Sequence, residues 1–225
     1  MSNLSYFKCG KSKPGGNMSY SESDKTKQLI QKLSSNLEKG SLNIYSLFLS
    51  CLGLVVLGIA LGWSVANLTG RTNSFPGWWP EPALLLVWGI FSAYLLSKLA
   101  FPEETSTWVF WAAGSFLIVW TVFILSRFFT EEAPTHIHVG LCSVILATTS
   151  ILFGAGAWFI LRTMASSRPG LSGFLFLNLL LASSNLGLKF ICPVQDPSHI
   201  LISHVSFTLV WIGILYFPIR KKFSW

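Results

Sequence analysis

Six long apolar runs limit most strongly how this chain can fold. They lie at about residues 42–64, 81–99, 107–128, 138–162, 171–190 and 199–218. Each run is long enough to cross ~30 Å of hydrocarbon as a helix that rises ~1.5 Å per residue. Composition excludes a soluble domain, because 11% of the residues are charged, against about 25% in soluble domains. The sequence therefore predicts an all-α integral membrane bundle of six transmembrane helices over residues 42–218.

A polar segment, residues 1–41, precedes the first apolar run. Its first part, 1–23, has no apolar period and is expected to be disordered, and Met18 within it offers a second place for translation to start. Apolar side chains recur at helical spacing over residues 24–39, which predicts a short amphipathic helix. The apolar face consists of Leu29, Ile30, Leu33 and Leu37. This face indicates either a helix that lies on the membrane surface or one that docks a soluble partner.

The basic residues predict the orientation of the bundle. Six spans put both termini on one side, and 13 of the 16 Lys and Arg residues fall on that side. The other side has Arg71, Arg127 and Lys189. Positive charge marks the cytoplasmic side, so we expect both termini, including the basic tail 219–225, in the cytoplasm of a bacterial cell. The net charge of +7 is thus explained by topology first, and then by attraction to anionic lipid or an acidic partner.

Two of the four cysteines are predicted to meet. Cys142 and Cys192 are 50 residues apart, and each lies 25 residues from Ser167, in the short link between the fourth and fifth spans. Two antiparallel helices bring them to one height near the outer surface, and a disulfide needs Cα atoms within ~7 Å. The outer side of a bacterial inner membrane is oxidising, so the pair is a candidate redox sensor. Cys9 and Cys51 are expected to be ordinary small residues.

All four histidines also fall on the outer side. Thiolate and imidazole suit copper and zinc, so a metal site is a second candidate role. Its candidate ligands are Cys142, Cys192, His136, His138 and His199. His204 is not among them, because a spacing of five residues places it about 140° around an α-helix from His199. No cofactor is expected, apart from copper or zinc as a sensed ligand.

No sequence pattern indicates an enzyme. GLSG at residues 170–173 matches the Gly-x-Ser-Gly of rhomboid proteases, but Ser172 and His204 begin their helices on opposite sides of the membrane, and a nucleophile must approach its base within about 3 Å. No carboxylate is expected inside a span, and transport normally needs ionisable groups at mid-membrane. The alternative functions are a small six-span transporter or channel without a soluble partner, and a membrane enzyme that works with quinone or haem, for which His138 and His204 are the only candidate axial ligands.

Five local motifs occur together in this chain. They are KQLIQKLSSNLE before the first span, a cysteine that opens the fourth, LRTMASSRPGLSG between the fourth and fifth, Cys-Pro-x-x-Asp after the fifth, and an aromatic C-terminus after Arg and Lys. In this combination, over about residues 24–225, the chain resembles the NrsF family of membrane anti-sigma factors, negative regulators of sigma-F.

The resemblance implies a partner and a signal. The apolar face of residues 24–39 would hold an extracytoplasmic-function sigma factor at the inner membrane, with no direct contact to nucleic acid. Cys142 and Cys192 would register oxidant or metal stress, and the signal would release the sigma factor.

Overall fold

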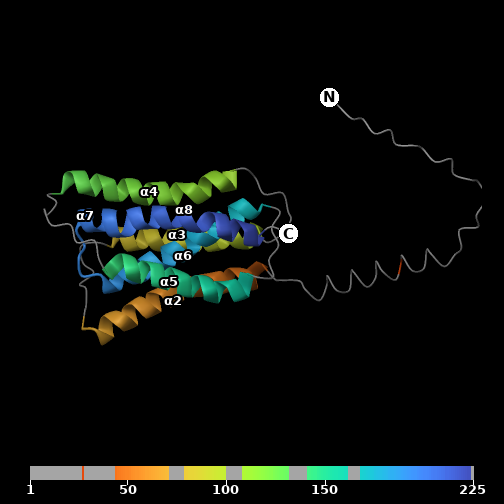
Figure 1. The fold of residues 1–225 in the computed structure, drawn as a ribbon, viewed down its shortest axis with the longest axis horizontal. Helices are drawn as coiled ribbons and strands as arrows, with labels where there is room; N and C mark the ends of the chain where they lie inside the picture. Colours follow the sequence, from red (N-terminus) through yellow and green to blue (C-terminus); the bar gives the residue numbers. More distant parts are fainter. Residues whose placement is uncertain are drawn as a thin grey trace, which may run out of the picture. The chain divides into compact units, whose positions relative to one another are not determined.

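A computed structural model describes the helices of the bundle and the links next to them (Figure 1). The described residues are 27, 44–70, 79–99, 108–131, 141–161 and 168–223. All of them except residue 27 belong to one compact unit, Asn43–Trp225. The predicted amphipathic helix over residues 24–39 lies outside the described residues apart from Lys27, so the structure bears on the bundle.

The described part of the chain is helical and contains no strand. Its elements are α2 (Ile44–Leu68), α3 (Pro80–Leu99), α4 (Trp108–Thr130), α5 (Leu141–Leu161), α6 (Pro169–Ile191), α7 (Pro197–His199), η1 (Ile200–Ser206) and α8 (Phe207–Phe223). The last three follow one another without a break and form one continuous helical segment. The predicted all-α class is confirmed for these residues.

Five helical segments are long and apolar enough to cross a membrane. They are Ile44–Leu68, Pro80–Leu99, Leu141–Phe159, Pro169–Ile191 and Pro197–Phe223. α4 is helical over 23 residues, but its described apolar stretch, Gly114–Thr130, is shorter. Five of the six predicted spans therefore meet the length and hydropathy expected of a membrane helix, and the sixth is a helix with a shorter apolar stretch.

α6 is the central helix of the bundle. It packs against α2, α3, α5 and α8, and 89% of its apolar stretch is buried. Polar side chains on such a helix must find partners inside the protein. Asn178 accepts a hydrogen bond from Trp88 Nε1 of α3 at 3.0 Å. Asn185 donates one to Thr208 Oγ1 of α8 at 3.0 Å. These bonds connect α6 to two of its neighbours.

Glycines let α6 approach its neighbours closely. A Cβ at Gly58 of α2 would lie 2.6 Å from the Ser183 carbonyl oxygen, and a Cβ at Gly62 would overlap the Gly187 carbonyl. Small residues at such crossings bring backbones into contact, which holds helices together in a bilayer. The α2–α6 contact therefore depends on the absence of side chains at these positions.

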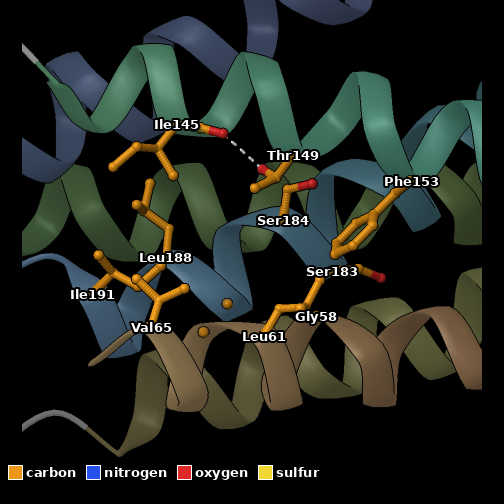
Figure 2. A pocket seen from close by; sticks show the side chains of 12 residues that line it. Gly58, Leu61, Val65, Ile145, Thr149, Phe153, Ser183, Ser184, Leu188 and Ile191 are labelled. Carbon is orange, nitrogen blue, oxygen red and sulfur yellow. Dashed lines mark hydrogen bonds between the residues drawn. The ribbon is translucent and has the colours of Figure 1, made fainter. Parts of the chain in front are cut away.

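An apolar pocket of about 220 Å³ lies between α2, α5 and α6 (Figure 2). The Thr149 hydroxyl at its wall donates to the Ile145 carbonyl of its own helix at 2.8 Å, and the Ser183 hydroxyl donates to the Leu179 carbonyl at 2.8 Å. These groups are satisfied without a ligand. In α5, 22% of the apolar stretch is buried, so most of this helix faces away from the interior of the bundle.

Candidate functional site

The start of α5 and the end of α6 bring the two predicted cysteines together. Cys142 is the second residue of α5, and Cys192 directly follows α6. The Cys142 thiol donates a hydrogen bond to Cys192 Sγ at 3.2 Å. Cys192 is buried and Cys142 is partly exposed. The meeting of these two residues is confirmed, and their sensing role stays a prediction.

The link between α6 and α7 holds Cys192 in place. Cys192 has an extended backbone (φ −75°, ψ 115°), and Pro193 after it has no N–H with which to continue the helix. Pro197 then opens α7 at a position that favours proline. Gln195 Nε2 donates to the Cys192 carbonyl at 2.8 Å, and Gln195 Oε1 accepts from Lys189 Nζ at 3.2 Å. Gln195 therefore holds the polar link against the end of α6, through one hydrogen bond to Lys189 and one to Cys192 itself.

A π-helical turn places two histidines beside the cysteines. η1 begins directly after His199 and contains His204. In a π-helix each N–H bonds to the carbonyl five residues earlier, so residues five apart lie one turn apart on the same face. The two imidazole centroids are 5.6 Å apart. The expectation that His199 and His204 point in different directions is therefore wrong, because it assumed α-helical spacing.

Four potential ligand atoms gather at this end of the bundle. The two Sγ atoms and one ring nitrogen each of His199 and His204 all lie within 4.8 Å of one another. His199 Nε2 is 3.4 Å from Cys192 Sγ. His204 is 0% exposed, and among the described residues neither of its ring nitrogens has a hydrogen-bond partner outside this cluster. The site thus combines a dithiol with two buried imidazoles.

The surroundings of Cys192 change its acidity. The hydrogen bond from the Cys142 thiol lowers the pKa of Cys192, and burial opposes this shift. The thiolate is the form that attacks oxidants and binds metals. The hydrogen bond from Cys142 therefore favours the thiolate form of Cys192.

A buried ion pair lies next to the thiols. Lys189 Nζ is 2.6 Å from Glu81 Oε2, and their side chains are 2% and 0% exposed. Trp120 Nε1 donates to the other carboxylate oxygen of Glu81 at 3.2 Å. The expectation that no carboxylate lies inside a span is wrong for Glu81, which sits in the first turn of α3. The sequence signal for this pair was the position of one glutamate and one lysine at the same end of two predicted spans.

Other candidate residues lie elsewhere or outside the described part. Ser172 is in the first turn of α6 and His204 is at the far end of the antiparallel α8 segment, so the two stay apart. Cys51 is buried in α2, as expected of a small apolar residue. The residues outside the described part are His136, His138, Leu29, Ile30, Leu33, Leu37 and Cys9.

Fold and site together define a helical membrane protein with thiols and imidazoles gathered at one end of its bundle. A family model described as NrsF, negative regulator of sigma F, matches residues 39–218, and the chain belongs to this family. Comparison with the curated proteins and with the solved structures found no match. Membership implies a negative regulator of a sigma factor, that is an anti-sigma factor, with a sigma factor as partner and a regulatory rather than an enzymatic role.

Proposed function

We propose that this protein is an inner-membrane anti-sigma factor that holds an extracytoplasmic-function sigma factor at the cytoplasmic face. It releases this partner when the thiol pair at the outer face reacts. Family membership supports the partner. The sensing half of the proposal is carried by one observation, the 3.2 Å separation of the Cys142 and Cys192 sulfurs at the bundle end opposite the end of α8.

The distribution of charge supports this orientation. One end of the bundle carries basic residues of three helices. They are Lys98, Arg168, Arg220, Lys221 and Lys222. At the end with the thiols, the described basic residues are Arg127 and Lys189. By the positive-inside rule the first end is cytoplasmic and the thiols face outward.

The partner contact is assigned to the cytoplasmic segment. The apolar face of residues 24–39 provides a helix-in-groove type of ligand for a soluble protein. Residue 44, where α2 begins, follows this segment after a few residues. In this proposal a change in the position of α2 alters the docking segment, because the two are continuous in the chain.

The proposed chemistry at the outer face is oxidation of the dithiol. A peroxide accepts two electrons from the two sulfurs, its O–O bond breaks, and the two thiol protons leave with the oxygens as water. An S–S bond forms between Cys142 and Cys192. The sulfurs already face each other, so the step needs a small displacement of α5 against α6.

The coupling to the cytoplasmic side runs through α6. This helix ends at Ile191, directly before Cys192, and contacts α2 backbone to backbone at Gly58 and Gly62. The pocket beside α5 gives that helix room to shift when the sulfurs bond (Figure 2). A complete switch from 1:99 to 99:1 requires a preference of ~5.5 kcal/mol for one conformation. In this proposal the S–S bond favours the conformation in which the ends of α5 and α6 are drawn together.

The test is transcription from a sigma-dependent reporter in cells with and without peroxide. Cys142→Ser with Cys192→Ser is expected to keep the reporter repressed in both conditions, because binding of the sigma factor is intact and the signal is lost. Cys51→Ala is the matched control, since this cysteine lies in the same bundle away from the pair. A membrane-impermeant thiol reagent should label Cys142, the partly exposed member of the pair, in resting cells and fail to do so after peroxide.

Two outcomes would contradict the proposal. A reporter that still responds to peroxide in the double variant removes the sensing role from these cysteines. A purified protein that carries solute flux in liposomes and binds no sigma factor would favour the transporter or channel instead.

A further inference from the structure

The dithiol and the two buried histidines form a donor set larger than a redox pair requires. Two sulfurs suffice for a disulfide, yet His199 and His204 are both buried against them, 6% and 0% exposed. A buried imidazole is expected to have hydrogen-bond partners. Among the described residues, His204 has none outside the cluster of ligand atoms, and its ligand nitrogen lies within 4.8 Å of the other three.

The backbone also departs from regular geometry at this point. The π-helical turn η1 is what brings both histidines to one face, and π-turns inside α-helices occur frequently at functional sites. His199 Nδ1 lies 3.5 Å from Ser203 Oγ, while its Nε2 points at Cys192 Sγ at 3.4 Å. An imidazole that ligates a metal through one nitrogen is usually oriented by a partner at the other.

We infer that Cys142, Cys192, His199 and His204 form one four-coordinate site for a thiophilic closed-shell cation, Zn²⁺ or Cu⁺. Thiolate and imidazole ligands suit these two ions, and two sulfurs with two nitrogens is a common tetrahedral set. This assignment differs from the sequence-based ligand set in taking His204 in place of His136 and His138.

The distances between the ligand atoms fit a tetrahedral metal site after small movements of these atoms. Metal–ligand distances of ~2.3 Å to sulfur and ~2.0 Å to nitrogen put the ligand atoms of a tetrahedral site about 3.3–3.8 Å apart. The Cys142–Cys192 and Cys192–His199 contacts, at 3.2 and 3.4 Å, are already close to that range. The remaining atoms, within 4.8 Å, need to move inward by about 1 Å.

Charge balance also suits a buried site. Two thiolates and two neutral imidazoles around Zn²⁺ have no net charge, so burial carries little electrostatic penalty. Binding to two thiols releases two protons, one from each sulfur, and forms two metal–sulfur bonds. With Cu⁺ the site keeps one negative charge. Cys142 is the one ligand that is partly exposed, which makes its side the route of entry.

The inference deepens the proposed function and rests on it for one point, that occupancy changes sigma-factor binding. Binding itself is tested separately. The full-length protein in detergent, kept reduced with a phosphine, is titrated with Zn²⁺, and with Cu⁺ under anaerobic conditions, against a chromophoric chelator. One ion per chain is expected for the ion that the site prefers, with two sulfur and two nitrogen neighbours in its X-ray absorption spectrum.

Single substitutions identify the ligands. His204→Gln and His199→Gln should each weaken binding by more than about tenfold, since loss of even an outer partner costs ten- to a hundredfold. His136→Gln and His138→Gln should leave binding unchanged, as should Cys51→Ala. Far-ultraviolet circular dichroism confirms that each variant is folded.

The outcomes separate the two proposals. No bound ion, binding that survives His204→Gln, or binding that is lost with His138→Gln would overturn the ligand assignment. A bound S₂N₂ ion without any effect on sigma-factor retention would leave the site in place and remove its role in the proposed function. Release of the sigma factor by peroxide, in a protein that binds no metal ion, would remove the metal site and leave the proposed redox function in place.

Discussion

Lys189 and Glu81 govern the electrostatics of the bundle end that carries the thiols. Their charged atoms are 2.6 Å apart and almost inaccessible, and Trp120 and Gln195 supply further hydrogen bonds. Gln195 in turn holds the Cys192 carbonyl. The ion pair therefore connects α3 to the end of α6 and to the link on which Cys192 lies.

Loss of one charge of this pair should destabilise the bundle more than loss of both. Lys189→Met leaves the Glu81 carboxylate buried without its cation, which costs about 3–5 kcal/mol for a buried pair. Lys189→Met with Glu81→Gln removes both charges and keeps an acceptor for Trp120, so most of the stability should return. The free energy of unfolding in detergent measures both.

Lys98→Met provides the comparison, because Lys98 is exposed at the other end of α3 and such a change is usually within about 0.5 kcal/mol. Equal stability of the single and double variants would mean that the two charges are not coupled.

At the scale of elements, the fold depends on how closely α2 and α6 approach. Gly58 and Gly62 face the backbone of α6 with no room for a Cβ, and the same two glycines line the pocket between α2, α5 and α6. A close α2–α6 contact beside an open space at α5 suits the proposed shift of α5 against the other two helices.

Gly62→Ala should therefore separate α2 from α6. The new Cβ would overlap the Gly187 carbonyl, and a backbone atom cannot move aside cheaply. Overpacking of this kind typically costs 1–3 kcal/mol, so we expect about that loss in the free energy of unfolding. Gly53→Ala, in the same helix with open space around its Cβ, should cause no loss. A Gly62→Ala protein as stable as Gly53→Ala would show that the crossing tolerates a methyl group.

At the scale of the whole molecule, the described helices form a compact unit that starts at Asn43. The bundle contains its own central helix, its own polar bonds and the thiol site. The proposed docking segment precedes it in the chain. In the proposed function, sensing belongs to the bundle and partner binding to the segment before it. The docking segment can therefore be deleted while the bundle is kept.

Deletion of residues 1–41 should abolish control and spare the bundle. We expect the sigma-dependent reporter to be active without any stress, while the shortened protein accumulates in the membrane and its Cys142 is labelled from outside as before. Deletion of residues 1–17, which leaves Met18 as the first residue, is the matched control and should keep the reporter repressed. Repression that persists without residues 1–41 would place the sigma-factor contact on the bundle itself.

The sequence by itself determined the helical class, the approximate spans and the meeting of Cys142 with Cys192. Hydropathy and length decide which segments are helices, because a span depends on apolar content and on 1.5 Å of rise per residue. The cysteine pair followed from counting equal distances along a hairpin. This count requires that the two helices are adjacent and antiparallel. It does not depend on how each helix is rotated about its own axis.

The tertiary structure decided what depends on rotation and on local departures from the α-helix. The π-turn after His199 reverses the prediction for His204, since one change in hydrogen-bond register turns all later side chains about the axis. The Lys189–Glu81 pair joins residues 108 positions apart, and which helices become neighbours cannot be counted along the chain. Periodicity places a side chain along its own helix, and packing against the other helices decides what that side chain meets.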